Sequence, residues 1–349
     1  MQYRELGRTG LKVSLICLGT MNWGEQNSEK DAHEQMDFAL EKGVNFFDTA
    51  EMYPVPPKAE IQGRTELYIG TWFKARKNRD KIILATKIIG GSSGPSGFPY
   101  IRDGKAKLDR KNIAAAVETS LKRLQTDIID LYQLHWPDRS TNTFGRLGYT
   151  HEDGDDGTPL EETLAALAEQ VKAGKIRHVG LSNETPWGTT RFLQLADAGL
   201  GPRMVSVQNP YNLLNRTYEI GLAEISIREQ CGLLAYSPLA FGVLSGKYLG
   251  GKRPAGARLT LYSRFQRYTG AKAEAAATAY VKIARDAGLD PAQMALAFIN
   301  RQPFVTSNII GATSLEQLKS NIASVDVKLS PDVLRAIEAV HMDIPNPCP

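Results

Sequence analysis

Four residues have side chains that could together give a proton to a reacting oxygen atom: Asp48, Tyr53, Lys87 and His135. They follow three successive short apolar runs. A tyrosine is a poor proton donor at neutral pH, since bringing its pKa from about 10 toward 7 requires about 4 kcal/mol of phenolate stabilisation. Lys87 could supply that stabilisation, Asp48 could hold Lys87, and His135 could orient or polarise the reacting oxygen. The group predicts a proton donor that works beside a separate source of hydride.

Each residue also has a simpler interpretation when it is taken alone. Lys87 could be an ordinary lysine at the end of a strand, and Asp48 could cap a helix. A barrel lyase that uses Lys87 as a Schiff-base nucleophile is a further alternative. An amine nucleophile needs a depressed pKa, whereas Tyr53 and Asp48 beside the lysine suit a charged ammonium. The combination therefore favours proton transfer.

The elements that must position these residues are short apolar runs that alternate with helical patterns along the whole chain, such as 32–40 and 113–124. This alternation is typical of repeated β-α units with a parallel sheet. Eight such units are best satisfied by a closed (β/α)₈ barrel, and we expect residues 1–349 to form this single domain. The eight predicted strands are Val13–Leu18, Val44–Phe47, Lys81–Thr86, Ile128–Leu134, His178–Leu181, Val205–Val207, Leu233–Tyr236 and Asn308–Ile310.

The residues that come directly after the predicted strands are unusually polar. Barrel enzymes place their sites at this end of the strands, although polar residues also follow strands simply because turns begin there. We predict that the set lines one mouth of the barrel. It comprises Gly19-Thr20, Asp48-Thr49, Lys87, His135-Trp136, Ser182-Asn183, Gln208-Asn209, Ser237 and Gly311.

Three connections exceed the usual few residues: Gly90–Lys107, Pro137–Pro159 and Pro238–Gly270. They could be flexible decoration, or they could rise from the mouth of the barrel and shape a pocket. We favour the pocket for the last two and leave both interpretations open for the first. The opening Tyr3–Leu18 is expected to form a hairpin that leads into the first strand, and Asp343–Pro349, with three prolines, is expected to be extended.

Composition excludes several classes of protein. The net charge of +4 comes without a long run of Lys or Arg, so we expect neither a nucleic-acid nor a membrane partner. Cys17, Cys231 and Cys348 are too scattered for a disulfide framework or a zinc site, and Asp153–Asp156 is interpreted as a solvated acidic loop rather than a metal site. No signal peptide or membrane-spanning apolar run is apparent, so we expect a cytoplasmic protein without a metal.

Taken together, several segments spread in order over nearly the whole chain resemble the aldo-keto reductases. The resemblance is greatest to the bacterial Tas-like reductases and more distant to the potassium-channel β subunits. It implies a (β/α)₈ barrel that binds NADP(H) across its C-terminal face, and it assigns catalysis to Asp48, Tyr53, Lys87 and His135. The segments are Asn45-Phe-Phe-Asp-Thr-Ala-Glu-Met-Tyr53, Leu84-Ala-Thr-Lys87, Leu131-Tyr-Gln-Leu-His-Trp-Pro137, Ile176-Arg-His-Val-Gly-Leu-Ser-Asn183 and Ala235-Tyr-Ser-Pro-Leu-Ala-Phe-Gly242.

The resemblance also implies the residues that would bind the nicotinamide and pyrophosphate parts of NADPH. Ser182, Asn183 and Gln208 would hold the carboxamide, and Tyr236 would lie against the ring. Thr20 and Asp48 belong to the same mouth. Along the phosphates it implies Ser237, Leu239, Gly242, Lys247 and Arg264.

The segment after the last strand, Gly311 to Asn321, resembles the part of the family that binds the adenosine phosphate. Thr313 would donate a hydroxyl at a helix N-terminus, where an anionic 2′-phosphate is favoured. Gln317 and Asn321 lie four residues apart and share one helix face, so both could reach the adenine. Ser320 replaces the glutamate often found there, which weakens one adenine contact and leaves the phosphate site. We therefore expect NADPH in preference to NADH.

Two tryptophans are candidates for the substrate pocket. Trp23 follows the first predicted strand and Trp136 follows His135, and each could instead be ordinary packing. The expected function is reduction of a small aldehyde or ketone to an alcohol, with hydride from NADPH and a proton from Tyr53. The alternative is an NADPH-binding regulatory or redox-sensing subunit with slow turnover. The sequence does not determine the physiological carbonyl or the oligomeric state.

Overall fold

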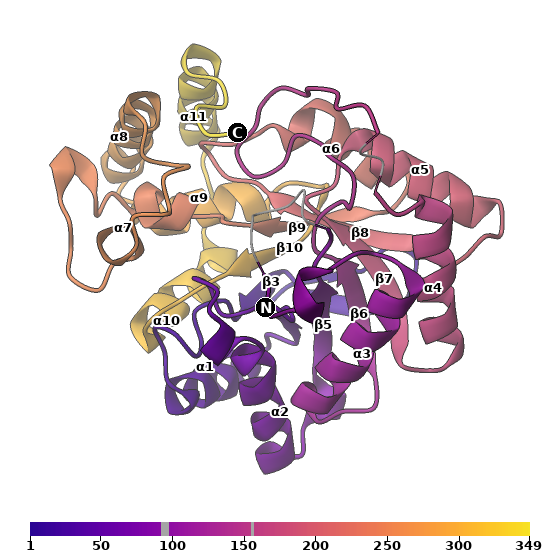
Figure 1. Cartoon of the computed structure of the whole chain (residues 1–349). Coiled ribbons are helices and arrows are strands. Elements are labelled where there is room, and N and C mark those ends of the chain that lie inside the picture. The colour runs from indigo at the N-terminus through magenta and orange to yellow at the C-terminus, as the bar shows by residue number, and fades with distance from the viewer. Residues whose placement is uncertain (92–97, 155–156) are drawn as a thin grey trace.

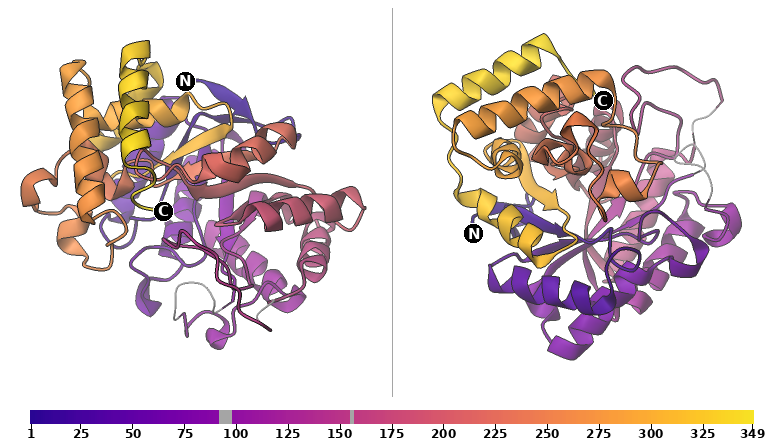
Figure 2. Two further views of the ribbon diagram at one scale, coloured as in Figure 1. Left: turned by 90° about the horizontal axis from the view of Figure 1, so that it is seen from above. Right: turned by 90° about the vertical axis from the view of Figure 1, so that its left-hand side faces the viewer.

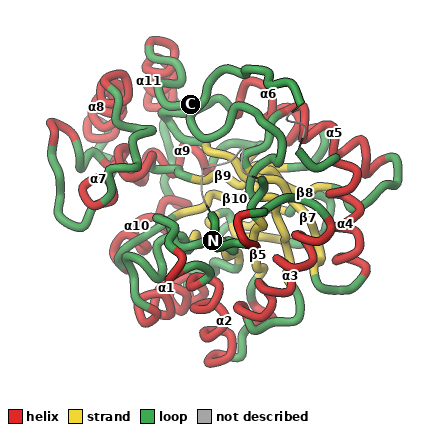
Figure 3. Tube along the Cα trace, in the orientation of Figure 1, coloured by secondary structure: helices red, strands yellow, loops and turns green. Residues whose placement is uncertain are grey.

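The computed structural model describes residues 1–91, 98–154 and 157–349, and its centre is a closed parallel barrel (Figure 1). The strands follow the order β10-β3-β4-β5-β6-β7-β8-β9 around the barrel. Figure 3 shows these strands at the centre and helices around them. This is the predicted (β/α)₈ architecture. The strands are β3 (Ile16–Gly19), β4 (Phe46–Asp48), β5 (Ile83–Ile88), β6 (Ile129–Leu134), β7 (Ile176–Ser182), β8 (Met204–Pro210), β9 (Gly232–Tyr236) and β10 (Val305–Ile310).

The barrel strands are buried on both faces because the helices cover the outside and side chains fill the inside. All six residues of β6 and all six of β10 are buried. The helices that follow the strands are α1 (Glu29–Glu41), α2 (Arg64–Arg76), α3 (Arg110–Leu124), α4 (Leu160–Lys172), α5 (Pro186–Asp197), α6 (Tyr218–Arg228), α9 (Pro291–Asn300) and α10 (Leu315–Ala323).

Polar caps make two helices longer than their apolar periodicity predicts. Ser28 accepts a hydrogen bond from the backbone of Asp31 and completes a capping box, so α1 begins before the predicted range 32–40. Asp109 accepts a hydrogen bond from the backbone of Asn112 at the start of α3, and α3 begins before the predicted range 113–124. The caps provide partners for backbone N–H groups that would otherwise have none, which extends each helix by three residues at its start.

A short antiparallel hairpin closes the N-terminal end of the barrel. It consists of β1 (Tyr3–Glu5) and β2 (Lys12–Ser14), with Gly7 and Gly10 at positive φ in its bend. A Cβ on Gly7 would lie 2.8 Å from Cβ of Val205, so the bend rests directly against β8. Because this end is sealed, the accessible mouth is the opposite end, where the parallel strands have their carboxyl ends.

Three further helices lie outside the barrel. They are α7 (Arg258–Leu261), α8 (Ala271–Asp286) and α11 (Pro331–Asp343). The two longer ones pack side by side, as both views of Figure 2 show. The chain after α11 returns to the barrel mouth, where Cys348 N donates to Leu214 O over 3.1 Å. No helix in the described ranges is long and apolar enough to cross a membrane.

The predicted strands all exist, but their bounds differ in an informative way. The first predicted strand, Val13–Leu18, was wrong as one element, because Val13 and Ser14 belong to the hairpin and the barrel strand begins at Ile16. Lys87 and Gln208 lie within strands, although they were expected just after them. Both strands continue past these polar residues because the side chains of Lys87 and Gln208 form hydrogen bonds with Asp48 inside the barrel.

Candidate active site

A buried ion pair lies at the centre of the barrel mouth. Asp48 ends β4, Lys87 lies on the neighbouring strand β5, and Lys87 Nζ is 2.6 Å from Asp48 Oδ2. The Lys87 ammonium also donates to the Thr49 carbonyl over 2.7 Å. Lys87 is 0 % exposed and Asp48 is 2 % exposed, so water contributes little to either charge. An uncompensated charge in this position would be costly, and each group depends on the other.

The second oxygen of Asp48 is held by two amides from other strands. Gln133 Nε2 donates to Asp48 Oδ1 over 3.0 Å, and Gln208 Nε2 donates to it over 2.8 Å. Gln208 also donates to Gln133 Oε1 over 3.1 Å. Asp48 is thereby fixed from strands β6 and β8, so its carboxylate presents Lys87 in one orientation.

Tyr53 and His135 complete the group above this pair. Nζ of Lys87 lies 5.0 Å from the centre of the Tyr53 ring, and the rings of Tyr53 and His135 meet edge to face at 5.7 Å. In the described part of the chain, His135 Nδ1 is buried without a hydrogen-bond partner. The structure thus brings together all four residues singled out in the sequence, and both Tyr53 and His135 line the same cavity.

Burial and neighbouring charges shift the pKa values of Lys87, Tyr53 and His135. Burial alone would lower the pKa of Lys87, but the Asp48 carboxylate outweighs it and the pKa is raised. Burial raises the pKa of the Tyr53 phenol, and the Lys87 ammonium opposes this rise only in part. Burial, with help from Lys87, holds the pKa of His135 well below its ordinary value. The expected lowering of the Tyr53 pKa toward 7 is therefore wrong for this state of the protein, because desolvation dominates.

These charge states decide between two of the chemistries considered from the sequence. A Schiff-base lysine needs a neutral amine, whereas Lys87 is held as an ammonium by Asp48. Tyr53 is a protonated phenol and His135 a neutral imidazole at neutral pH. Such a site can donate a proton to an oxygen atom placed between these two rings.

A second polar network lies beside the first, on the strands β7, β8 and β9. Tyr236 donates its hydroxyl hydrogen to Asn183 Oδ1 over 2.6 Å, and Asn183 Nδ2 donates to the carbonyl of His135 over 2.8 Å. Ser182 Oγ donates to the carbonyl of Gln208 over 2.8 Å. Asn183 has a positive φ of 51°. The residues predicted to hold a nicotinamide are thus adjacent to the catalytic group.

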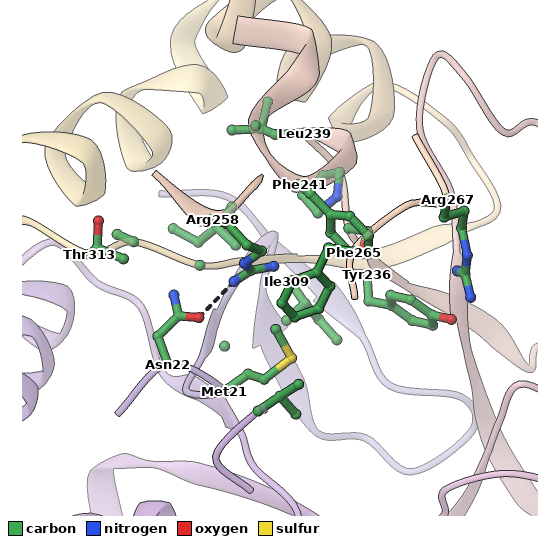
Figure 4. Close-up of a pocket in the computed structure, with 18 of the residues that line it drawn as sticks. Met21, Asn22, Tyr236, Leu239, Phe241, Arg258, Phe265, Arg267, Ile309 and Thr313 are labelled. Atoms are coloured by element: carbon green, nitrogen blue, oxygen red, sulfur yellow. Dashed lines mark hydrogen bonds between the residues drawn. The ribbon is translucent and has the colours of Figure 1, made fainter. Parts of the chain in front are cut away.

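One cavity of about 1280 Å³ connects this region with the last strand. Ligand pockets are commonly about 300–1,000 Å³, so the cavity has room for a dinucleotide and a small second molecule. Figure 4 shows its residues in a row from Thr313 through Arg258 to Tyr236 and Arg267. The predicted site residues that line it are Thr20, Asp48, Tyr53, His135, Trp136, Ser182, Asn183, Gln208, Tyr236, Ser237, Leu239, Gly242, Lys247, Arg264, Gly311, Thr313, Gln317 and Asn321.

Two cations, Lys247 and Arg258, line this cavity. Burial lowers the pKa of Lys247, and Arg258 lowers it further. Burial also lowers the pKa of Arg258, whose guanidinium lies over the rings of both Phe241 and Phe265 and donates to Asn22 Oδ1 over 2.6 Å. Neither cation has a carboxylate within 4.0 Å in the described part of the chain. Such a pair fits the phosphate groups of a dinucleotide.

The adenosine end differs slightly from the prediction. Ser314, not Thr313, caps α10, and its hydroxyl accepts from the backbone of Gln317 over 3.3 Å. Thr313 precedes the cap, and its hydroxyl donates to Gln317 Oε1 over 3.2 Å. Asn321, one turn further, donates to the carbonyl of Gly311 over 3.3 Å. Thr313, Gln317 and Asn321 line the cavity together, so the helix-face prediction holds as geometry.

The two tryptophans have different positions. Trp136 lines the cavity and lies 4.8 Å from the ring of His135. Trp23 was wrongly predicted as a pocket residue, because it is 1 % exposed, packs in the core and donates to Gln35 Oε1 over 3.1 Å. Strand β3 ends at Gly19, and the turn that follows it places the indole of Trp23 against Gln35 of α1. Its neighbours Met21 and Asn22 line the cavity instead.

The long connections are anchored at the mouth by Asp138. Its carboxylate accepts hydrogen bonds from the backbone of Gly91, of Leu108 over 3.0 Å and of Thr158 over 3.2 Å. This carboxylate therefore ties the first long connection to the second. Residues of all three connections line the cavity, including Phe98, Phe144 and Phe265, which confirms the pocket interpretation for the last two; residues 92–97 and 155–156 lie outside the described ranges.

Sequence reasoning missed several cavity residues. Asn22 and Arg267 lie in loops and Arg258 begins the short helix α7, all without a motif, and Cys348 comes from the C-terminal segment that was expected only to be extended. These residues reach the mouth because the chain after α11 and the long connection after β9 fold back over the barrel. No local sequence pattern predicts that path. The basic residues of 238–270 could have indicated further cavity residues. Only Lys247 and Arg264 were predicted from this segment.

The closed parallel barrel, with helices between its strands and a polar cluster at its carboxyl end, defines a (β/α)₈ barrel protein. A model of the aldo/keto reductase family matches residues 15–341, and the chain belongs to this family. Family membership makes it an oxidoreductase that acts on carbonyl compounds.

Individual relatives cover nearly the whole chain. Protein tas of Escherichia coli is 56 % identical over 351 residues, with all of both chains covered. A probable voltage-gated potassium channel subunit beta of Arabidopsis thaliana is 33 % identical, with 99 % of this chain and 98 % of the relative covered. L-glyceraldehyde 3-phosphate reductase of Escherichia coli is 31 % identical, with 93 % and 88 % covered. The resemblances drawn from the sequence motifs are thereby confirmed.

Proposed function

We propose that this protein reduces aldehydes or ketones to alcohols with NADPH and that Tyr53 donates the proton. The observation that carries the proposal is the buried Lys87–Asp48 pair beside a half-buried tyrosine whose ring meets that of a neutral histidine. Reduction of a carbonyl by hydride needs one proton at the oxygen atom, and the Tyr53 hydroxyl carries such a proton. Bound NADPH would supply the hydride.

Each residue then has a defined task. Tyr53 holds the proton that goes to the substrate oxygen, and the Lys87 ammonium stabilises the phenolate that forms. Asp48 fixes Lys87 and offsets its burial. His135, neutral and without a side-chain partner at Nδ1 in the described part of the chain, is placed to orient the substrate oxygen. Asn183 and Tyr236 would hold the nicotinamide end, and Lys247 and Arg258 the phosphates.

The first experiment is fluorescence titration of the purified protein with NADPH and with NADH, followed by NADPH absorbance in the presence of a panel of aldehydes, ketones and quinones. Tight NADPH binding with carbonyl-dependent oxidation supports the proposal. Tight binding with negligible turnover, together with a stable protein partner in a pull-down, favours the regulatory alternative. Absence of binding would overturn both.

The pH dependence of carbonyl reduction is expected to be flat between about pH 7 and pH 9. Tyr53 has a raised pKa, so it stays protonated throughout this range, and His135 has a lowered pKa, so it stays neutral. Oxidation of the alcohol needs the phenolate and should accelerate as the pH rises. The check is kcat/KM, measured from initial rates as a function of pH, for carbonyl reduction and for alcohol oxidation. A reduction rate that falls through neutral pH would show instead that Lys87 prevails over burial once substrate is bound.

Two arginines of the β9 connection allow a test of cofactor contacts. Arg264 is exposed and packs over the ring of Phe265 at 5.8 Å, so it is free to reach a ligand. Replacing Arg264 by Met is expected to weaken NADPH about 10-fold or more and NADH far less, because only NADPH carries the 2′-phosphate.

Replacing Arg258 by Met serves as the comparison, because Arg258 lies midway along the cavity, where a pyrophosphate common to both cofactors would lie. It should weaken NADPH and NADH alike. Dissociation constants from cofactor fluorescence measure both effects. Equal losses of the two cofactors in Arg264→Met would remove Arg264 from the 2′-phosphate site.

The remaining expectations concern setting rather than chemistry. The three cysteines are free and buried, as suits a reducing cytoplasm, and a cytoplasmic location stays a prediction. A small carbonyl compound is the proposed partner, without nucleic acid or membrane. Groups of His, Cys, Asp or Glu suited to a metal ion do not occur within the described ranges.

A further inference from the structure

A buried carboxylate that the proposed chemistry does not use lies two residues before Tyr53. The side chain of Glu51 is 3 % exposed, and its backbone N–H donates to the carbonyl of Lys87 over 3.1 Å. Oε1 of Glu51 accepts a hydrogen bond from the backbone N–H of Ile89 over 2.8 Å. Glu51 is therefore tied at two points to the end of β5, beside the lysine of the catalytic group.

The partner of this carboxylate comes from the first long connection, 90–107. Nη1 of Arg102 donates to Glu51 Oε2 over 2.6 Å, and Nη2 donates to Glu51 Oε1 over 2.9 Å. The side chain of Arg102 is only 16 % exposed, so the pair is largely shielded from water. Charge-assisted bidentate pairs of this kind are strong and fix the geometry of both partners. The pair therefore joins the first long connection to the segment that carries Tyr53.

The backbone at Arg102 has a conformation that needs support from its surroundings. Arg102 and Asp103 have φ values of 48° and 54°, in the left-handed region that is unfavourable for residues with a Cβ. Strained conformations persist only where other contacts hold them, and they gather at functional sites. For Arg102, the bidentate pair with Glu51 is such a contact.

An apolar cluster joins the same two segments at the cavity. Met52, which separates Glu51 from Tyr53, belongs to a cluster with Phe98 and Trp136, and Tyr53 packs against this cluster. The rings of Phe98 and Trp136 stack with their centres 5.9 Å apart, and both line the cavity. Among the described residues of the cavity lining, neither member of the ion pair occurs. The pair can therefore act on the pocket through its neighbours, without touching a ligand.

We propose that Arg102 is a positioning residue for the reaction and that it acts through Glu51, which holds the Tyr53 phenol where it meets the substrate oxygen. This inference rests on the proposed carbonyl reduction and adds to it a residue from outside the catalytic group. Arg102 forms and breaks no bond, and Tyr53 remains the proton donor. A misplacement of about 1 Å at a reacting group can cost about 100-fold in rate, so such a contact can control kcat from a distance.

The opposite end of β5 offers a matched control. The side chain of Asp130 is 2 % exposed, accepts from the backbone N–H of Leu84 over 2.9 Å and lies 2.7 Å from Arg79 Nη2. Arg79 also donates to two backbone carbonyls, so its loss removes several hydrogen bonds. This pair resembles the Glu51 pair in burial and in its backbone contact, but it lies at the closed end of the barrel. Its loss should lower stability and leave Tyr53 in place.

Arg102→Gln is expected to lower kcat for benzaldehyde reduction by about 10- to 100-fold, with the Kd of NADPH unchanged. Arg79→Gln should lower the urea midpoint and leave kcat nearly unchanged. Arg102→Lys should recover part of the lost rate, since lysine keeps the charge and loses the planar fork. An unchanged kcat in Arg102→Gln, or an equal fall of kcat in Arg79→Gln, would overturn the inference.

Hydrogen exchange followed by mass spectrometry separates this inference from the function on which it rests, because it needs no turnover. In Arg102→Gln, the peptides that cover 49–63 and 98–108 should both exchange faster than in the unmodified protein, whereas both should stay protected in Arg79→Gln. Faster exchange confined to 98–108 would overturn the link to Tyr53, whether or not benzaldehyde is reduced. Faster exchange in both peptides supports the link even in a protein that reduces no aldehyde, a result that would count against the proposed function alone.

Discussion

Replacing Tyr53 by phenylalanine is expected to lower kcat for carbonyl reduction by about 10²–10⁴ while NADPH binding stays nearly unchanged. The substitution removes one oxygen atom from a ring that lies against His135 at 5.7 Å and above Lys87 at 5.0 Å. The remaining ring fills the same space, so the packing of the mouth persists. The loss is therefore one of proton donation rather than of fold.

Steady-state rates with a neutral aldehyde and a cofactor fluorescence titration on the same preparation separate the two effects. Tyr132→Phe is the matched control, because its buried hydroxyl has no hydrogen-bond partner in the described part of the chain and lies away from the cavity lining. Unchanged turnover in Tyr53→Phe would overturn its assignment as the proton donor.

Replacing Lys87 by methionine is expected to reduce both catalysis and stability. Without the ammonium, the Tyr53 phenolate loses its stabilising charge and kcat should fall by about 10² or more. The Asp48 carboxylate would be left buried at 2 % exposure with only amide partners. Breaking a buried ion pair in this way costs about 3–5 kcal/mol in the free energy of unfolding.

A double variant distinguishes the structural loss from the catalytic loss. Asp48→Asn combined with Lys87→Met removes both charges, so urea denaturation should show stability partly restored, whereas kcat should not recover. Lys122→Met, at an exposed position on α3, controls for the substitution itself. Full activity in Lys87→Met, or a double variant no more stable than the single one, would contradict the role of the pair.

Pattern and residue type in the sequence alone determine much of this protein. The eight-unit alternation predicted the barrel because each amphipathic helix and apolar run records its own burial locally. The grouping of Asp48, Tyr53, Lys87 and His135 could be predicted because parallel strands bring their carboxyl ends to one mouth. Motifs extended this to the side chains predicted to bind a cofactor, which line one cavity.

Tertiary structure decided what depends on packing between distant segments. The pKa of Tyr53 is raised because its phenol is desolvated in the folded protein. The sequence indicates the neighbouring charges of Lys87 and Asp48 but not this desolvation. Trp23 lies in the core because the turn after β3 directs its indole toward Gln35 of α1, and the path of that turn cannot be predicted from the spacing after the strand. Arg258 and Arg267 reach the cavity only because the long β9 connection folds across the mouth. Local patterns report which face of an element is buried, whereas the three-dimensional path of a loop sets which charges meet a ligand.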